Sequence, residues 1–247
     1  MGNPPNESLT LLASGATSLG ISLDDAQLAA FARYRELLLD WNTHVNLTAI
    51  TAPAEVTTRH FLDSLTIAQA VPTAMRQDAP RLLDVGAGAG FPGLPLAVVF
   101  PHWHVTLLEA TGKKVRFMET VIGELELSNA RAIHARAEEL AHQAAYRGHF
   151  DLVTARAVAA LPTLLEYCCP FARVGGLVIT PKKGDLAAEI TAGSRAAKLL
   201  GARLLDAVEV TVPPLIDGRV LLVAVQEKPC SPQYPRASGA PSKRPLG

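Results

Sequence analysis

Apolar residues in the first eighty positions recur at helical spacing. The pattern predicts an amphipathic helix over residues 22–45, because apolar positions three or four residues apart share one helix face. Ser22 followed by Asp25 is expected to cap its start. A second helix is expected after Pro53, running to residue 71, so this region would be all-helical. The apolar face of the first helix would consist of Phe31, Tyr34, Leu38, Trp41 and Val45.

From Arg81 onwards, short apolar runs alternate with Gly and Pro turns and helical patterns. Such alternation is typical of βαβ units, which build a parallel, doubly wound sheet. After the second run, Val115, Met118 and Ile122 have helical spacing and support an intervening helix. The strands are expected at residues 82–86, 105–109, 131–135, 150–155 and 176–180.

The end of the chain has a different pattern. Residues 202–212 and 219–227 are strand-like, and only PPLIDG joins them, which is too short for a parallel crossover. We therefore expect an antiparallel hairpin. The final segment is rich in Pro, Gly and Ser and contains basic residues but no acid, which predicts an extended basic tail. The predicted units are a helical cap (1–78), an α/β domain (79–228) and the tail (229–247).

Composition limits the class of protein. Hydrophobic residues make up 49% of the 247 positions, which is ample for a sizeable core, and 23 basic residues balance 23 acidic ones. The overall charge therefore does not indicate a polyanion partner. The cysteines (Cys168, Cys169 and Cys230) lack metal-type spacing and do not suggest a disulfide framework, and no apolar run reaches membrane-spanning length. We expect a cytoplasmic protein without a metal site.

Residues 84–93, DVGAGAGFPG, follow the first predicted strand and contain four glycines. Gly88, Gly90 and Gly93 satisfy the dinucleotide fingerprint GxGxxG, with Glu109 about twenty residues further on. Read from Asp84, the same stretch resembles the first motif of class I S-adenosylmethionine-dependent methyltransferases. Both readings need a bare backbone that approaches a ligand and an acid for ribose hydroxyls. The glycine count alone cannot choose between them.

Two further features favour the methyltransferase. An acid inside the loop, Asp84, suits a ligand with a sulfonium and an amino acid end better than one with a pyrophosphate. The predicted C-terminal hairpin also resembles the antiparallel last strand of the class I methyltransferase fold, whereas a dinucleotide domain would continue with βα units. The expected fold is therefore a Rossmann-like α/β domain with a mostly parallel seven-stranded sheet and an N-terminal helical extension.

Several separate motifs occur in an order similar to that of the small-subunit ribosomal RNA methyltransferase G family, also called glucose-inhibited division protein B. The similarity extends from about Trp41 to the C-terminus. TARA stands where the family commonly has SRA, and residues 142–149 lengthen one connection. The motifs are WNTHVNLTAI (41–50), RHFLDSL (59–65), LLDVGAGAGFPGLPLA (82–97), VTLLEATGKKVRFM (105–118), RAE (136–138), FDLVTARA (150–157) and the closing YPR and PSKRPL.

This resemblance implies methyl transfer from S-adenosylmethionine to N7 of a guanine in the 530 loop of bacterial 16S rRNA, leaving S-adenosylhomocysteine. It implies that Gly86 and Phe91 line the donor pocket, that Ala137 and Glu138 meet the adenine end, and that Arg156 lies beside donor and base. The donor site is expected to comprise Asp84, Gly86, Gly88, Gly90, Phe91, Glu109, Ala137, Glu138 and Arg156.

Guanine N7 has a free lone pair, so its attack needs no general base, and orientation alone can supply roughly 7 to 11 kcal/mol. Cations are needed to hold the RNA. We expect Arg156 and Lys182 to act at the reaction site, and Asp63 to pair with Arg59 or His60. The expected RNA-binding residues are Arg59, His60, Lys182, Arg219 and Arg236. The alternatives are a methyltransferase for another base or a small molecule, and a non-catalytic nucleotide-binding module.

Overall fold

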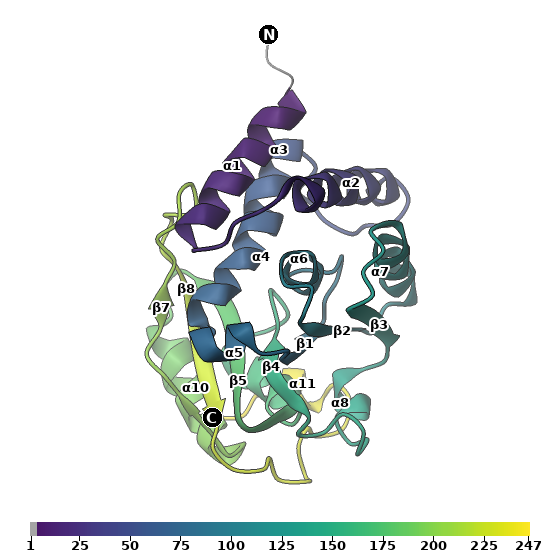
Figure 1. The fold of residues 1–247 in the computed structure, drawn as a ribbon. Helices are drawn as coiled ribbons and strands as arrows, with labels where there is room; N and C mark the ends of the chain where they lie inside the picture. Colours follow the sequence, from purple (N-terminus) through teal and green to yellow (C-terminus); the bar gives the residue numbers. More distant parts are fainter. Residues whose placement is uncertain (1–3) are drawn as a thin grey trace.

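The computed structural model describes residues 4–247 and has three layers, with one central sheet between two helical layers (Figure 1). The strand order is β3-β2-β1-β4-β5-β8-β6, and β7 also pairs with β8. The strands are β1 Arg81–Val85, β2 His104–Glu109, β3 Ala130–His134, β4 Phe150–Thr154, β5 Ala172–Lys183, β6 Ala202–Leu204, β7 Val208–Glu209 and β8 Arg219–Gln226.

The first five strands are parallel, whereas β8 runs antiparallel to β5 and lies between β5 and β6. This arrangement confirms the class I methyltransferase fold and the antiparallel C-terminal hairpin. Every predicted parallel strand is present, and only β5 is much longer than expected. Because β8 is antiparallel, its first residue, Arg219, lies opposite Lys183 at the carboxyl end of β5.

The first half of the hairpin differs from the single strand expected over 202–212. Leu204 lies opposite Ala224, but Val208 lies opposite Leu221, so four steps along the chain match only three along β8. The extra residue is accommodated as a bulge, which divides the run into β6 and β7. The sheet therefore has eight strands in place of the seven expected.

The N-terminal region is helical, as the sequence predicts, with α1 Pro4–Ser18, α2 Asp25–Asn42 and α5 Thr73–Gln77. The predicted cap of α2 at Ser22 and Asp25 is wrong. Asp24 caps the helix instead, since its side chain accepts from the Gln27 amide and the Gln27 side chain accepts from the Asp24 amide. The helix also ends three residues before Val45.

The second predicted helix is a continuous but irregular helical segment. It consists of α3 Pro53–Val56, a π-helical turn η1 Thr57–Leu62, α4 Asp63–Leu65 and a 3-10 turn η2 Thr66–Ala70. It runs from α3 beside α1 down to α5 (Figure 1), and its middle residue Asp63 contacts Arg156 and Arg219 at the carboxyl edge of the sheet. His60, Phe61 and Asp63 on this segment are buried.

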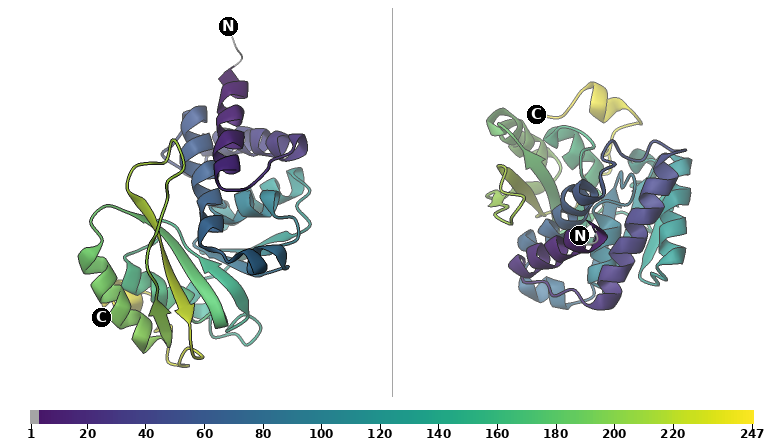
Figure 2. Two further views of the ribbon diagram at one scale, coloured as in Figure 1. Left: turned by 60° about the vertical axis from the view of Figure 1, so that its left-hand side comes forward. Right: turned by 90° about the horizontal axis from the view of Figure 1, so that it is seen from above.

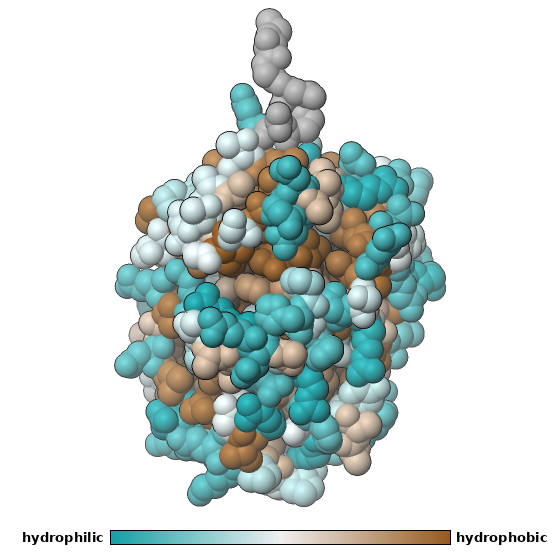
Figure 3. All heavy atoms as spheres, viewed as in Figure 1, coloured by the Kyte–Doolittle hydropathy of each residue, from teal (hydrophilic) through white to brown (hydrophobic). Residues whose placement is uncertain are grey.

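Two apolar cores cover the two faces of the sheet. The N-terminal helices share one core with α6 Gly93–Val99, α7 Gly112–Glu124 and sheet residues such as Leu82 and Leu107. The opposite face packs on α9 Leu161–Cys168 and α10 Ala187–Leu199. The N-terminal helices therefore pack directly on the sheet. Figure 3 shows hydrophobic residues in a hollow below these helices on an otherwise largely hydrophilic face.

The C-terminal segment is not extended, contrary to our expectation. It runs along the side of the molecule away from α1 and ends with the short helix α11 Ala240–Lys243 (Figure 2, right). Cys230, Tyr234 and Pro241 are buried. This segment, although rich in proline and glycine, is therefore an irregular segment packed against the rest of the protein.

Polar contacts hold this segment in place. The Glu166 side chain has an exposed fraction of 0% and accepts hydrogen bonds from the Arg236 backbone and guanidinium at 2.6 to 2.9 Å. Arg147 donates to the carbonyls of Cys230, Ser231 and Tyr234. Among the described residues, no helix is long and apolar enough to cross a membrane.

We predict that Arg236→Gln lowers the free energy of unfolding by about 3 kcal/mol, because it leaves the buried Glu166 carboxylate without its cation. Denaturant unfolding of the full chain measures this change. The exposed Lys243→Gln removes one charge from the same segment and should change stability by less than about 0.5 kcal/mol. Equal stability of wild type and Arg236→Gln would contradict the structural role of the pair.

Candidate functional site

Two adjoining hollows lie at the carboxyl edge of the sheet, and they share Gly86, Ala110 and Val158. Their volumes are about 400 and 190 Å³. Open α/β sheets commonly bind ligands at this edge. The larger hollow is lined by Leu47, Thr48, His60, Gly86, Ala87, Gly88, Ala89, Phe91, Glu109, Ala110, Lys114, Arg156, Ala157 and Val158.

The chain bends sharply after β1, and glycine is required there for two different reasons. Gly86 has φ +70° and faces the hollow, and a Cβ at this position would lie 2.8 Å from Val158. Gly90 does not line either hollow. A Cβ on Gly90 would lie 2.8 Å from the Tyr34 hydroxyl, which itself donates to the Ala89 carbonyl. Gly90 therefore allows α2 to support the bend from behind.

Asp84 also acts behind the bend. Its carboxylate is fully buried and accepts a hydrogen bond of 2.8 Å from the amide of Gly93, the first residue of α6. Burial raises the pKa of Asp84 to about 7, and the Gly93 hydrogen bond and Arg156 act in the opposite direction. The carboxylate occupies the helix terminus where a dinucleotide site would place its pyrophosphate. This geometry favours the methyltransferase reading of the glycine motif.

Glu109 lies at the end of β2 and joins the bend to the next connection. One carboxylate oxygen accepts from the Gly88 amide at 3.0 Å, and the other accepts from the Thr111 amide at 2.8 Å. Each oxygen retains a lone pair, since a carboxylate oxygen can accept two hydrogen bonds. Glu109 lines the larger hollow, so it can still accept from a ligand's hydroxyl groups.

The smaller hollow is lined by Ala137 and Glu138, whose contact with the adenine end stays a prediction. Both residues belong to the short helix α8 Ala137–Leu140. One oxygen of Glu138 accepts a hydrogen bond of 3.0 Å from the Gly239 amide in the C-terminal segment. This contact fixes the carboxylate and connects the C-terminal segment to the wall of the hollow.

A stack of rings forms the wall between the N-terminal helices and the bend. The Phe91 ring stacks on His60, with centroids 4.5 Å apart, and on Tyr34, with centroids 5.4 Å apart. The Arg156 guanidinium lies 5.1 Å from the Phe91 centroid, within the range of a cation–π interaction. These ring contacts therefore hold the N-terminal helices, the glycine bend after β1 and the loop after β4 together.

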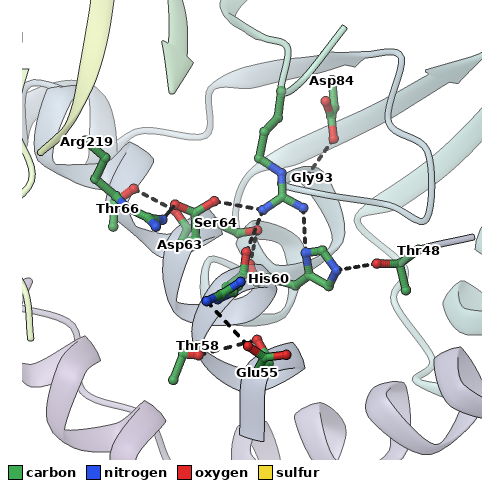
Figure 4. Close-up of polar contacts among 12 residues, drawn as sticks. Thr48, Glu55, Thr58, His60, Asp63, Ser64, Thr66, Asp84, Gly93 and Arg219 are labelled. Carbon is green, nitrogen blue, oxygen red and sulfur yellow. Dashed lines mark hydrogen bonds and ion pairs between the residues drawn. The ribbon is translucent and has the colours of Figure 1, made fainter. Parts of the chain in front are cut away.

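Polar contacts fix Arg156, and Figure 4 labels two of the residues that it contacts, His60 and Asp63. One terminal nitrogen donates to the Asp63 carboxylate at 2.8 Å and to the Arg59 carbonyl at 3.1 Å, and the other donates to His60 Nδ1 at 3.1 Å. The second Asp63 oxygen accepts from Arg219. Our expectation that Asp63 pairs with Arg59 or His60 is therefore wrong. Its carboxylate pairs with two arginines from distant parts of the chain.

His60 is uncharged at neutral pH. Burial, and to a smaller extent the adjacent Arg156 charge, lower the pKa of His60 to about 4. Because Nδ1 accepts from Arg156, the ring proton is on Nε2, which donates to the Thr48 hydroxyl at 2.8 Å. Protonation of Nδ1 would remove the lone pair that accepts the hydrogen bond from Arg156. It would also place the positively charged imidazolium next to the Arg156 guanidinium.

The other predicted basic residues lie at different distances from the hollows. Lys182 lines neither hollow, and its ammonium donates to the Ala159 carbonyl at 2.8 Å and to Glu189 at 2.6 Å. It therefore supports the loop that follows Arg156. Arg59 is exposed and pairs with Glu55 at 3.4 Å. Arg236 lies in the C-terminal segment against Glu166. Direct RNA contacts by these residues stay predictions.

The sequence reasoning missed several residues of the hollow. Thr48 and Lys114 line the hollow. Both belong to motifs that we quoted, but we assigned them no role. Val158 also lines the hollow and faces Gly86. Tyr34 was assigned only to the apolar helix face, yet its hydroxyl supports the bend. The polar end of a buried tyrosine needs a partner, and this signal could have found it. Among the described residues, no cluster of His, Cys, Asp or Glu could hold a metal ion.

We predict that His60 makes stability fall as the solution is acidified. A folded-state pKa of about 4 against 6.5 in the unfolded chain gives a contribution present above pH 6.5 and lost as pH falls to 4. The expected loss is about 3 kcal/mol, at 1.36 kcal/mol per pKa unit. Unfolding of wild type and His60→Gln across this range measures it, and parallel pH profiles would refute the assignment.

Comparison with known proteins agrees with this geometry. The family model described as rRNA small subunit methyltransferase G matches residues 27–214. A protein of that name from Dehalococcoides mccartyi strain CBDB1 is 45% identical over 235 residues, which cover 95% of this chain and 98% of that protein. One from Roseiflexus sp. strain RS-1 is 44% identical over 239 residues, covering 96% and 100%.

Solved structures share the fold at low sequence identity. MtNAS in complex with MTA and tNA aligns with a TM-score of 0.53 and 14% identity, covering 91% of this chain and 78% of that chain. The Methanococcus jannaschii fibrillarin pre-rRNA processing protein aligns with a TM-score of 0.51 and 17% identity, covering 65% and 72%. With the family match over most of its length, the chain belongs to the rRNA small subunit methyltransferase G family.

Proposed function

We propose that this protein transfers a methyl group from S-adenosylmethionine to N7 of a guanine in the 530 loop of 16S rRNA, releasing S-adenosylhomocysteine. The family membership and the two adjoining hollows support this function. The enzyme acts as a cytoplasmic monomer on the small ribosomal subunit or its RNA. Among the predicted RNA-binding residues, the exposed Arg59 precedes His60, which lines the larger hollow.

The residues around the hollows fit such a donor. Glu109 keeps acceptor capacity for the ribose hydroxyls, Glu138 and Ala137 line the smaller hollow for the adenine, and Gly86 leaves space between the two hollows. Bound S-adenosylmethionine supplies a methyl group on a positively charged sulfur. Gly88 and Phe91 line the larger hollow, where they would hold the end of the donor that carries this methyl.

We choose guanine N7 as the methylated atom because of the polar groups that line the larger hollow. The remaining lone pairs of Glu109 are assigned to the ribose hydroxyls of the donor, and both His60 nitrogens are engaged by Arg156 and Thr48. Neither group is arranged to remove a proton from a substrate. A ring nitrogen with a free lone pair needs no such base, so holding the base in line with the methyl suffices.

In this scheme Arg156 is a positioning residue. Its terminal nitrogens donate to Asp63, the Arg59 carbonyl and His60, and its guanidinium lies over Phe91. The guanidinium therefore keeps the post-β4 loop against the aromatic wall. A fixed wall limits the orientations of the incoming guanine and excludes water from the methyl.

We predict that radiolabelled donor incubated with small subunits from cells lacking the gene places one methyl group on N7 of a guanine in the 530 loop. Nuclease digestion and mass spectrometry of the RNA locate the label. Label at another base, or only on protein, would overturn the proposal.

A matched pair of glycine variants connects the activity to the hollows. Gly86→Ala places a methyl 2.8 Å from Val158 and should weaken donor binding at least tenfold in calorimetry and abolish labelling. Gly20→Ala imposes nearly the same backbone strain, since its φ is +71°, but nothing lies within 4 Å of its Cβ. It should lose some stability and retain donor affinity. Equal donor affinity in both variants would contradict the placement.

A further inference from the structure

A third hollow lies at the opposite edge of the sheet, where β1 to β4 begin. Its volume is about 350 Å³. Because the strands are five or six residues long, about 16 to 20 Å separates it from the donor hollows at their other ends. Its lining residues are Arg81, His104, Val105, Thr106, Ser128, Asn129, Ala130, Arg131, Ala145, His149 and Phe150.

The lining of this amino-edge hollow has an unbalanced charge. Arg81 and Arg131 contribute guanidinium groups, His104 and His149 add two imidazoles, and no lining residue is acidic. This contrasts with the whole chain, in which basic and acidic residues are equal in number. Asp151, which follows the lining residue Phe150, forms ion pairs with Arg173 at 2.6 Å and with Arg81 at 3.8 Å. The arginine side chains at this edge of the sheet therefore outnumber the single Asp151 carboxylate.

Arg131 is oriented for a ligand with several oxygens. Its Nε donates to the buried Thr106 hydroxyl at 3.2 Å, which fixes the plane of the guanidinium. In the part of the chain that the structure describes, its two terminal nitrogens have no hydrogen-bond partner. A guanidinium with both terminal nitrogens available matches two phosphate oxygens, with bidentate geometry and complementary charge.

The other polar side chains of the amino-edge hollow are not arranged to recognise the edges of nucleic acid bases. The Asn129 side-chain amide donates to the carbonyls of Ala97, Phe100 and Trp103, so it is committed to the fold. His149 is also engaged, because its Nδ1 donates to the Arg147 carbonyl at 2.7 Å. The arginine, His104 and Ser128 side chains remain, and as donors they suit phosphate oxygens irrespective of base sequence. The wall formed by residues 142–149 is held rigidly, because Arg147 donates to three carbonyls of the C-terminal segment.

We propose that the amino-edge hollow binds backbone phosphates of the RNA whose base enters the donor site, as a second, sequence-independent contact. This inference rests on the proposed function, because it takes RNA as the substrate. The separation from the donor hollows corresponds to several nucleotides, so the contact orients an RNA segment outside the modified loop. Phosphate contacts position a nucleic acid, and base contacts select its sequence.

The test is the double variant Arg81→Gln/Arg131→Gln of the full chain, with Arg195→Gln/Lys198→Gln as the control. The control removes the same charge from exposed positions on α10, away from the three hollows. Filter retention of small subunits is measured from about 50 to 200 mM salt. We expect the affinity of the test variant to fall about tenfold and its salt slope to decrease by about 1.4 to 1.8, at 0.7 to 0.9 per lost phosphate contact.

Donor binding in calorimetry and kcat at saturating RNA should remain at wild-type values. An unchanged salt slope, or an equal decrease in the control, would overturn the proposal. Inorganic phosphate and AMP are titrated in parallel, and if either binds wild type but not the test variant while RNA retention is unchanged, the hollow serves a free phosphate ligand instead. If the wild-type protein retains subunits but does not methylate the guanine, the proposed function is refuted. The salt slopes of the two variants would still test phosphate binding at the amino-edge hollow.

Discussion

The site depends on one buried carboxylate that two arginines share. Asp63 receives Arg156 from the loop after β4 and Arg219 from the start of β8, and it lies on the irregular helical segment that crosses from the N-terminal helices to the sheet. A buried carboxylate without partners would be costly, so this pairing favours the fold in which all three elements meet there. The same contact holds Arg156 against Phe91 beside the larger donor hollow.

This constraint explains why helices outside the α/β domain matter for the donor site. Tyr34 and His60 stack on Phe91 from the N-terminal side, and the Tyr34 hydroxyl supports the glycine bend. The bend itself exposes backbone to the ligand because Gly86 has no side chain. The sheet positions the bend, and the helical segment supplies the wall opposite it. The larger hollow, where we propose that the donor binds, is therefore built jointly by the two regions.

The sequence predicts the repeated parts of the fold well, because hydrophobic periodicity and turn residues are local signals. Each parallel strand and the β8 hairpin could be predicted in this way. The partner of Asp63 could not, since Arg156 and Arg219 are 93 and 156 residues away from it and charge pairing leaves no local pattern. The packed C-terminal segment was missed for a similar reason, because its composition resembles a free tail while Glu166 anchors it from a distance.

A double-mutant cycle on Asp63 and Arg156 tests the central claim most directly. The free energy of unfolding is measured for wild type, Asp63→Asn, Arg156→Gln and the double variant. The account predicts a coupling free energy of about 1 to 3 kcal/mol, because each side chain depends on the other in a buried setting. Additive losses, with a coupling below about 0.5 kcal/mol, would contradict it.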